Sequence, residues 1–466
     1  MKVVIADAAN LKNSWRISNH PNLGALYLIG YLREMRDGLQ LYYLDAQLGL
    51  KEHLDLLEKI RPGLYGLSFS VMREKDAFGT IEAVRKKFPG MPIVCGGPYP
   101  TVMYESILQD LPVDVCALGE GEVTMAELVD AFRADGCLDD IRGIAFKKDG
   151  RVVRTAPRPV IRDLDSVPLP AWDMIDFRKY AGSYQYMARP NTAIITSRGC
   201  PFDCVFCANA VWKLSKPWMR LRKPANICDE ISVLYNMGIR EISIRSDEFN
   251  PVLPWALDLC REIQKLGLKD LFFQGNIRAD NVTEELASEM KKCNFWMVQI
   301  GIESGNQRTL DGIGKKITLE QIVRTCRLLK RHGIKTYGYI MIYHAWEDNG
   351  AFCFESAGDV DKTLDFVRTL KKERLLDYMS FSTTTPMRGS RLFDIAMRHG
   401  RLKRGGDVND LSDFSMDLPG VAEKAMRRSR RKGLLLQMSL NLRSGHNNFR
   451  DWPKNFHKIR IFLKSV

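Results

Sequence analysis

The stretch SRGCPFDCVFCANA, residues 197–210, carries three cysteines in a CxxxCxxC pattern, at Cys200, Cys204 and Cys207. Three thiolates hold a zinc ion only together with a fourth ligand. A four-iron cluster differs, because three thiolates can bind it and leave one iron open for a substrate. The next cysteine along the chain is Cys228, well beyond the motif. The spacing therefore favours an iron–sulfur cluster, and a zinc site completed by Cys228 or a distant histidine is the alternative.

The motif lies directly after an apolar run at residues 192–196, which predicts a strand. Five further strand patterns follow at 241–249, 270–278, 295–305, 334–342 and 376–386, with helical stretches between them. Six βα units in sequence predict a parallel, TIM-like (βα)6 barrel, closed or partial, over residues 191–400. Functional residues of such barrels follow the carboxyl ends of strands, which is where the three cysteines fall.

Residues 1–150 alternate short apolar runs with helical patterns, which predicts a doubly wound, Rossmann-like α/β domain with a parallel sheet. Small and turn-forming residues follow its predicted strands, and ligands of such sheets bind beyond the carboxyl ends of the strands. No GxGxxG follows the first strand, so a dinucleotide site is disfavoured. Five prolines fall between residues 151 and 190, and they predict a linker there.

The composition indicates an ordinary globular protein of 466 residues, with 45% hydrophobic and 27% charged residues. No apolar run is long enough for a membrane span, and the amino terminus lacks a signal-peptide pattern, so we expect a cytoplasmic protein. Most of the eleven cysteines sit singly in helix or strand patterns, which disfavours disulfides. Residues 401–466 form a basic, mainly helical segment; its run at 427–432 is more typical of a solvated helix face than of a nucleic-acid site.

The sequence RGCPFDCVFC resembles the signature of the radical S-adenosylmethionine (SAM) superfamily. The resemblance implies that Cys200, Cys204 and Cys207 bind a [4Fe-4S] cluster. Its open iron would chelate the amino and carboxylate groups of SAM, with Phe206 near the adenine. An electron from the cluster would cleave SAM to a 5′-deoxyadenosyl radical, which implies a low-potential electron donor such as flavodoxin or ferredoxin.

The first domain, with PNLGALYLIGYLR, GGPYPT and LGEGE, resembles that of cobalamin-binding radical SAM proteins, which include methyltransferases and anaerobic porphyrin-ring cyclases. Its loops would contact the corrin, and each loop residue also suits an ordinary turn. The expected neighbours are Ser68, Ser70, Gly97, Pro98, Tyr99, Glu120 and Gly121. The family motif DxHxxG is not met, since Gln47 stands in place of histidine. We expect cobalamin to bind without imidazole below cobalt; the alternative is a domain that no longer binds it.

The same resemblance assigns candidate SAM contacts to the barrel. Asp247 and Glu248 end the second strand, Gln274 and Arg278 follow the third, and Glu303 and Ser304 match the fourth-strand motif. For each, a structural salt bridge or cap is the alternative.

The fifth strand departs from the family pattern, so Tyr343 and His344 are expected to face the substrate, with His344 a proton donor or acceptor. A histidine that only bonds its own loop is the alternative. Arg388 or Arg391, after the sixth strand, could hold an anionic substrate group.

These features together predict a cobalamin-dependent radical SAM methyltransferase that acts on an unactivated centre of a small-molecule, possibly anionic, substrate. A radical cyclisation or rearrangement assisted by cobalamin is the alternative within the same chemistry. A non-catalytic iron–sulfur or zinc regulator is the alternative from another class. The sequence does not name the substrate.

Overall fold

The computed structural model describes residues 1–443 apart from 12–19, 181–184, 209–212, 214–215 and 404–413. The chain forms two compact units. Unit 1 comprises Met1–Gly182 with Val211–Arg222, and unit 2 comprises Ser183–Ala210 with Lys223–Val466. Within the described ranges, no helix is long and apolar enough to cross a membrane.

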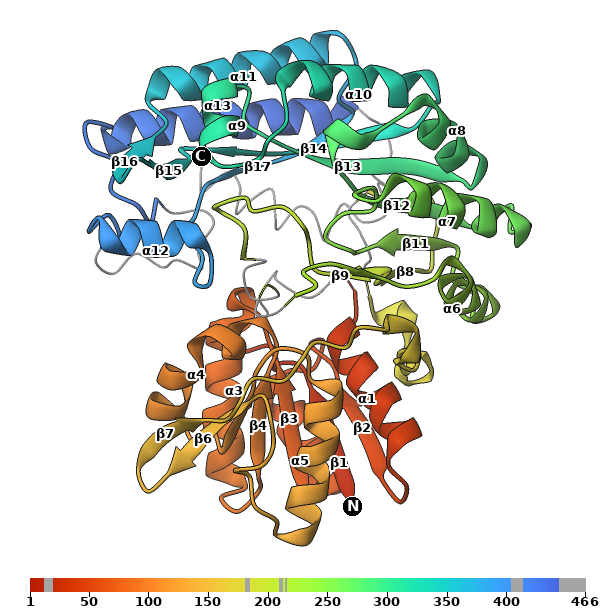
Figure 1. Cartoon of the computed structure of the whole chain (residues 1–466), viewed down its shortest axis with the longest axis vertical. Helices are drawn as coiled ribbons and strands as arrows, with labels where there is room; N and C mark the ends of the chain where they lie inside the picture. Colours follow the sequence, from red (N-terminus) through yellow and green to blue (C-terminus); the bar gives the residue numbers. More distant parts are fainter. Residues whose placement is uncertain (12–19, 181–184, 209–212, 214–215, 404–413, 444–466) are drawn as a thin grey trace. The chain divides into compact units, whose positions relative to one another are not determined.

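Unit 1 is built on a seven-stranded sheet in the order β2-β1-β3-β4-β5-β6-β7. Its parallel strands are β1 (Lys2–Ala6), β2 (Gln40–Leu44), β3 (Leu64–Ser68), β4 (Ile93–Gly96) and β5 (Val115–Ala117). The helices between them are α1 (Leu23–Met35), α2 (Leu50–Ile60), α3 (Glu74–Lys87), α4 (Pro98–Asp110) and α5 (Glu122–Ala134). Figure 1 shows this unit in red to orange.

Helices cover both faces of this sheet because successive side chains of a strand point to opposite faces. Val3 and Ile5 of β1 pack in one apolar core with residues of α1 and α5. Val4 and Ala6 pack in a second core with residues of α2, α3 and α4. The prediction of a doubly wound, Rossmann-like domain is therefore confirmed.

The boundaries of unit 1 differ from the predicted ones. Strands β6 (Ile144–Lys148) and β7 (Arg151–Arg154) form an antiparallel hairpin that extends the parallel sheet beyond β5. Its turn, Asp149-Gly150, has φ values of 51° and 77°, as a tight Asp-Gly hairpin requires. The predicted boundary at residue 150 thus cuts this hairpin. The proline-rich segment 151–182, predicted as part of a linker, lies within unit 1.

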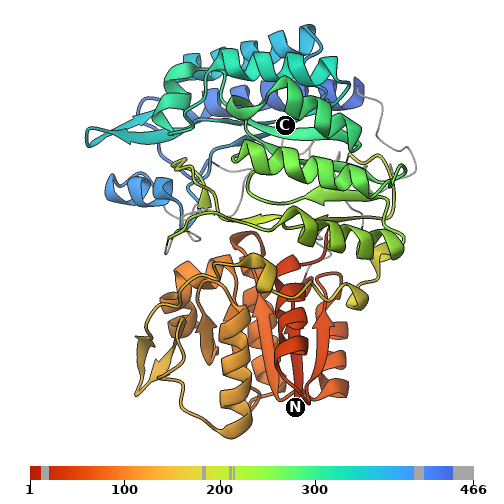
Figure 2. The same ribbon diagram turned by 45° about the vertical axis from the view of Figure 1, so that its right-hand side comes forward.

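Unit 2 contains the predicted (βα)6 arrangement as a six-stranded parallel sheet in the order β17-β14-β13-β12-β11-β8. The strands are β8 (Asn191–Ile194), β11 (Glu241–Ile244), β12 (Phe272–Ile277), β13 (Phe295–Glu303), β14 (Lys335–Ile342) and β17 (Tyr378–Thr383). Helices α6 (Pro224–Asn236), α7 (Leu253–Lys265), α8 (Glu284–Lys292), α10 (Leu319–Arg331) and α11 (Ala357–Lys372) connect them. The edge strands β8 and β17 do not pair with each other, so the barrel is partial. Figure 2 shows the helices along the outer side of the strands.

Helix α13 (Glu423–Arg443) covers the free edge of β17. Its Asn441 accepts a hydrogen bond from the Met379 amide at 3.0 Å, and its Gln437 accepts one from the Phe381 amide at 3.2 Å. Side-chain amides thus satisfy an exposed strand edge that would otherwise invite pairing with another chain. Part of the predicted basic segment is this helix; residues 404–413 and 444–466 lie outside the described residues.

The pH dependence of the free energy of unfolding tests the burial of His53 in the core of unit 1. Its imidazole is buried, its Nε2 lies 2.9 Å from the Tyr65 hydroxyl, and burial lowers its pKa to about 4. The folded state therefore binds fewer protons than the unfolded state between pH 6.5 and 4, so the free energy of unfolding falls as pH falls through this range. His53 accounts for about 3 kcal/mol of this change in the free energy of unfolding.

We expect His53→Gln to lose less thermal stability than the parent chain between pH 6.5 and 4.5. Chemical denaturation at several pH values gives a second measurement. His332→Gln is the control, because His332 pairs with Glu284 at the surface. Equal pH slopes for His53→Gln and the parent chain would contradict the expectation.

Candidate functional site

The loop that carries the three cysteines is anchored within unit 2 by backbone hydrogen bonds to two other segments. The Val205 amide donates to the Ile313 carbonyl at 3.0 Å, and the Leu392 amide donates to the Val205 carbonyl at 2.8 Å. Within the loop, the Cys207 amide donates to the Cys204 carbonyl at 3.1 Å. The thiols therefore lie on a backbone held by the segments after β13 and β17.

Two of the thiols combine burial with charged neighbours. Cys200 is 8% exposed, and burial raises the pKa of its thiol to about 11. Burial also raises the pKa of Cys204, while the cationic side chains of Lys315 and Arg278 lower it. Nearby cations favour the thiolate form that binds a metal.

A zinc site finds no support in the geometry. Among the described residues, no three His, Cys, Asp or Glu side chains are grouped as ligands of a single metal ion. Cys228, the proposed fourth ligand, is buried on α6, where its charged neighbours are Glu262, Asp229 and Lys265. A four-iron cluster takes its thiolates at separate corners, so its protein ligands need not converge on one metal ion.

A buried group of charges lies beside Cys204. The Lys315 ammonium contacts the Glu303 carboxylate at 3.1 Å, and both side chains are less than a tenth exposed. Burial lowers the pKa of Lys315, but the carboxylates of Glu303 and Glu248 outweigh this effect and hold it above its ordinary value. The sequence did not indicate Lys315, because neither lysine of GIGKKIT directly follows the end of a predicted strand.

Glu248 carries the clearest mark of a binding site. Its Oε2 atom is buried and, among the described residues, accepts no hydrogen bond. Burial raises its pKa to about 7, against the opposing effect of Lys315 and Arg278. A buried carboxylate oxygen without a donor is costly unless a ligand supplies one, and an ammonium group does so. A ligand that carries an ammonium group would satisfy this oxygen.

Two expected SAM contacts are already engaged by the protein. The Arg278 guanidinium donates to Asp280 at 2.9 and 3.1 Å and to the Lys315 carbonyl at 2.8 Å, with Phe202 stacked beneath it. The Ser304 hydroxyl is buried and bonds Glu355 and Thr363, each at 2.9 Å. These contacts support the alternative of structural salt bridges and caps at strand ends for both residues.

The predicted placement of Gln274 is wrong. Gln274 does not follow the third strand but is the third residue of β12, paired in register with Ser243 of β11. Its amide donates to the buried Glu241 carboxylate at 2.7 Å and its carbonyl accepts from Gln299 at 2.7 Å. The strand extends to Ile277, which leaves Gln274 inside a polar network in the interior of the sheet.

Phe206 and His344 lie close together, with ring centroids 5.7 Å apart. His344 is completely buried, burial lowers its pKa to about 4, and its Nδ1 lies 3.1 Å from the Thr384 hydroxyl. Its imidazole is therefore neutral at pH 7 and engaged with the sixth-strand end. This arrangement matches the alternative of a histidine that bonds its own surroundings.

Tyr343 is also buried, and its ring packs edge-on against Phe414. Its φ of 60° is unusual for a bulky residue, and the equivalent strand end in β13, Glu303, has the same φ. Asp247 lies near enough to Cys200 and Glu248 to raise the pKa of each.

The two arginines predicted after the sixth strand differ in their contacts. Arg391 pairs with Asp203 at 2.5 Å, while the Nε of Arg388 is buried without a partner in the described part of the chain.

Gly301 tests the Glu303–Lys315 pair. A Cβ atom at this glycine would overlap both the Glu303 carboxylate and the Lys315 ammonium. We expect Gly301→Ala to displace the pair, to lower the free energy of unfolding by about 1–3 kcal/mol, and to weaken SAM binding. Thermal unfolding and equilibrium dialysis of labelled SAM measure the two effects. Gly358→Ala is the control, since its added Cβ meets nothing closer than 3.7 Å; equal behaviour of the two variants would refute the expectation.

In unit 1 the loops that follow the parallel strands meet at one edge of the sheet. Gly97 has a φ of 96°, and a Cβ atom there would lie 2.9 Å from the Phe69 carbonyl and 3.1 Å from the Ser68 hydroxyl, so the position requires glycine. Pro98 begins α4 directly after it. Ser70 precedes a short 3₁₀ turn, and Tyr99 is buried, donates to Glu74 and packs on Phe69.

The same edge contains polar residues that the sequence did not reveal. Asp7, directly after β1, is buried and accepts hydrogen bonds from Tyr43 and Asn22, each at 2.6 Å. Burial raises the pKa of Asp7. Gln47 lies half-buried in the turn after β2, where its backbone N–H donates to the Asp45 carboxylate at 2.5 Å. No signal beyond position after a strand could have identified Asp7.

The loop after β2 presents Gln47 at this edge and no histidine. The nearby histidine of α2, His53, is held in the core by Tyr65. Gly121 begins α5. Glu120 is committed to Arg220, at 2.8 and 2.9 Å, and to the Ile161 amide at 2.7 Å. Gly97 and Gly121 give α4 and α5 no side-chain cap at this edge.

The two units together define a metal- and SAM-dependent enzyme with a cofactor domain. Residues 194–350 match the model of the radical SAM superfamily, and residues 17–129 match that of the B12 binding domain. An uncharacterized methyltransferase of Pyrococcus horikoshii is 31% identical over 384 residues, which cover 82% of this chain and 80% of that protein. The chain therefore belongs to the radical SAM superfamily and carries a B12 binding domain. The expected cofactors, a [4Fe-4S] cluster, SAM and cobalamin, are those of such enzymes, and the non-catalytic alternative is set aside.

Two further relatives are similar to this chain over part of their own length. The anaerobic magnesium-protoporphyrin IX monomethyl ester cyclase of Cereibacter sphaeroides is 28% identical; the match covers 90% of this chain and 66% of the cyclase. Cytidylyl-2-hydroxyethylphosphonate methyltransferase of Streptomyces wedmorensis is 27% identical, over 66% of this chain and 61% of that enzyme. The chain thus spans about two thirds of these two relatives.

Solved structures share the fold. The cobalamin-dependent SAM radical enzyme OxsB aligns with a TM-score of 0.74 at 18% identity, over 93% of this chain and 66% of OxsB. The radical SAM methyltransferase TsrM of Kitasatospora setae aligns with a TM-score of 0.68 at 18% identity, over 85% of this chain and 76% of TsrM. These likenesses confirm the predicted fold class of a Rossmann-like domain with a radical SAM barrel.

Proposed function

We propose that this protein is a cobalamin-dependent radical SAM methyltransferase that methylates an unactivated carbon or phosphorus centre of a small molecule. The observation that carries the proposal is the match to a methyltransferase over 82% of the chain, beside the matches to the radical SAM and B12 binding models. When bound, the cluster supplies the electron that cleaves SAM to a 5′-deoxyadenosyl radical, and cobalamin supplies the methyl group.

The side chains of unit 2 would bind and orient SAM. Cys200, Cys204 and Cys207 would hold the cluster on the anchored loop. The Oε2 of Glu248 would accept a hydrogen bond from the SAM ammonium. The buried Glu303–Lys315 ion pair would hold charged groups in place beside this carboxylate. Phe206 would offer an apolar face to the adenine. Because the surrounding groups are buried, they would exclude water from a reactive radical.

The residues near the substrate and the electron donor are also part of this proposal. We expect Tyr343 and His344 to shape the substrate side of the site, with His344 neutral rather than charged, since its pKa is about 4. Arg388 remains a candidate for an anionic substrate group, because its Nε has no partner among the described residues. A flavodoxin or ferredoxin would supply the electron.

A radical cyclisation is the second candidate, because three relatives of 28–31% identity are named anaerobic magnesium-protoporphyrin IX monomethyl ester cyclases. One experiment separates the candidates. Anaerobically reconstituted protein receives SAM with a deuterated methyl group, cobalamin, a reductant and candidate substrates. Deuterated methyl in the product supports methyl transfer, whereas 5′-deoxyadenosine with an unlabelled, ring-closed product supports cyclisation. Absence of 5′-deoxyadenosine with every substrate would refute both.

A further inference from the structure

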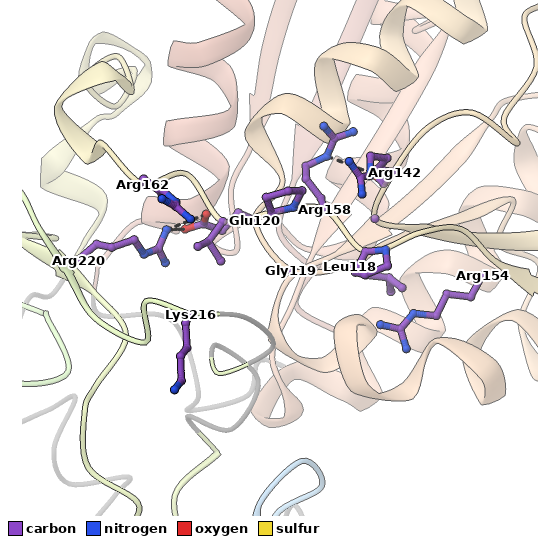
Figure 3. A pocket seen from close by; sticks show the side chains of 13 residues that line it. Leu118, Gly119, Glu120, Arg142, Arg154, Arg158, Arg162, Lys216 and Arg220 are labelled. Carbon is purple, nitrogen blue, oxygen red and sulfur yellow. Dashed lines mark hydrogen bonds and ion pairs between the residues drawn. The ribbon is translucent and has the colours of Figure 1, made fainter.

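A cavity of about 330 Å³ lies within unit 1, beyond the end of β5 and beside the β6–β7 hairpin (Figure 3). The volume is at the lower end of the range for small-molecule sites. Its wall is formed by segments far apart in the sequence. The lining side chains are Leu118, Gly119, Glu120, Arg142, Gly143, Arg154, Pro157, Arg158, Pro159, Val160, Arg162, Lys216 and Arg220.

The lining is strongly cationic. It contains five arginines and a lysine but a single carboxylate, that of Glu120. Arg220 neutralises this carboxylate, and Arg158 is paired with Glu127 outside the lining. Among the described residues, no carboxylate pairs with the side chains of the four remaining cations, Arg142, Arg154, Arg162 and Lys216.

Two arginines of the lining are held by hydrogen bonds, and one of them keeps a buried donor without an acceptor among the described residues. Arg220 is 5% exposed, and its Nε is buried without a hydrogen-bond acceptor in the described structure. Arg158 is fixed by Thr124, whose hydroxyl accepts its Nε hydrogen at 2.8 Å. A buried guanidinium hydrogen without an acceptor is costly, so the site lacks an acceptor that a ligand would bring.

Figure 3 shows Arg162 and Arg220 on the Glu120 side of the cavity, with Arg142, Arg154 and Arg158 on the other side. Guanidinium groups present paired donors that match the oxygens of a phosphate group, and several such groups around one cavity favour a multiply charged anion. Two prolines in the wall, Pro157 and Pro159, have no backbone N–H to donate, so the charged side chains are the main donors of the lining.

We propose that this cavity binds the phosphate group of an anionic small molecule. The residues of this site belong to unit 1, and its assignment does not depend on methyl transfer. Two sources share this chemistry: the phosphate of a free phosphorylated compound, and the phosphodiester of the nucleotide loop of cobalamin. The experiment below distinguishes them.

The probe is pyrophosphate, titrated by calorimetry into the full-length protein without cobalamin. We expect binding that weakens at least tenfold in Arg142→Gln/Arg162→Gln. The control is Arg133→Gln/Arg178→Gln, which removes the same charge at exposed positions of unit 1 outside the cavity. Circular dichroism spectra and thermal unfolding of both variants verify that the fold is intact.

The titration is then repeated with saturating cobalamin or cobinamide, which lacks the nucleotide loop. Binding of pyrophosphate that persists with both supports a separate phosphorylated ligand. Competition by cobalamin but not by cobinamide supports the phosphodiester of cobalamin as occupant. Three results would overturn the proposal: no binding of pyrophosphate, equal weakening in the control variant, or binding of citrate as tight as that of pyrophosphate, which would mean selection by charge alone.

Discussion

Cys204→Ala is expected to abolish iron binding and the cleavage of SAM. The thiol lies on a loop anchored by Ile313 and Leu392, next to the buried charges of Lys315 and Glu303. With three protein thiolates available, the loss of one leaves a four-iron cluster with two protein ligands. Cys200→Ala and Cys207→Ala should have the same effect. Iron and sulfide analysis after anaerobic reconstitution, with a 5′-deoxyadenosine assay, measures the result.

The matched control is Cys228→Ala. Cys228 is buried on α6 among charged residues that are not neighbours of the loop cysteines, so this variant should keep its iron. Cys326→Ala, on the buried face of α10, gives a second control for the stability cost of losing a buried thiol. If Cys228→Ala lost its metal as completely as Cys204→Ala, a four-thiolate site would replace the three-thiolate one.

Glu248→Gln should weaken SAM binding by roughly 10–100-fold, because a hydrogen bond between charged groups contributes about 1.5–3 kcal/mol. Glutamine keeps the size of the side chain but removes the charge that an ammonium requires. The buried Oε2 of Glu248, without a donor in the described structure, is the atom that loses its function. Equilibrium dialysis of SAM with the reconstituted protein gives the affinity, and iron analysis shows whether the cluster is retained.

Glu262→Gln is the control for this prediction, since Glu262 lies on the outer helix α7 and pairs with Lys265. Its SAM affinity should equal that of the parent chain. A SAM affinity of Glu248→Gln within twofold of the control, with a full complement of iron, would show that Glu248 does not bind the ammonium group. Loss of iron in Glu248→Gln would instead assign the residue to the support of the cluster loop.

Several features of the molecule could be predicted from local sequence. The CxxxCxxC spacing indicated the cluster ligands, because the motif's residues are adjacent in the chain and need no distant partner. Alternation of apolar runs with helical patterns predicted both sheets, since the periodicity of a buried strand is a local property. The Asp149-Gly150 turn was a legible hairpin signal at the predicted domain boundary, and its positive φ values fit that signal.

What the sequence alone determined was the class of enzyme and the order of its elements, because cluster spacing and strand periodicity are encoded within a few residues of one another. Only the tertiary structure decided which strand-end side chains are free. Arg278 and Ser304 end the expected strands but are engaged by Asp280 and Glu355, whereas Lys315, which has no motif, enters the charged group through Glu303. The pairing of a buried charge depends on residues brought together from distant segments, and that proximity is a property of the fold.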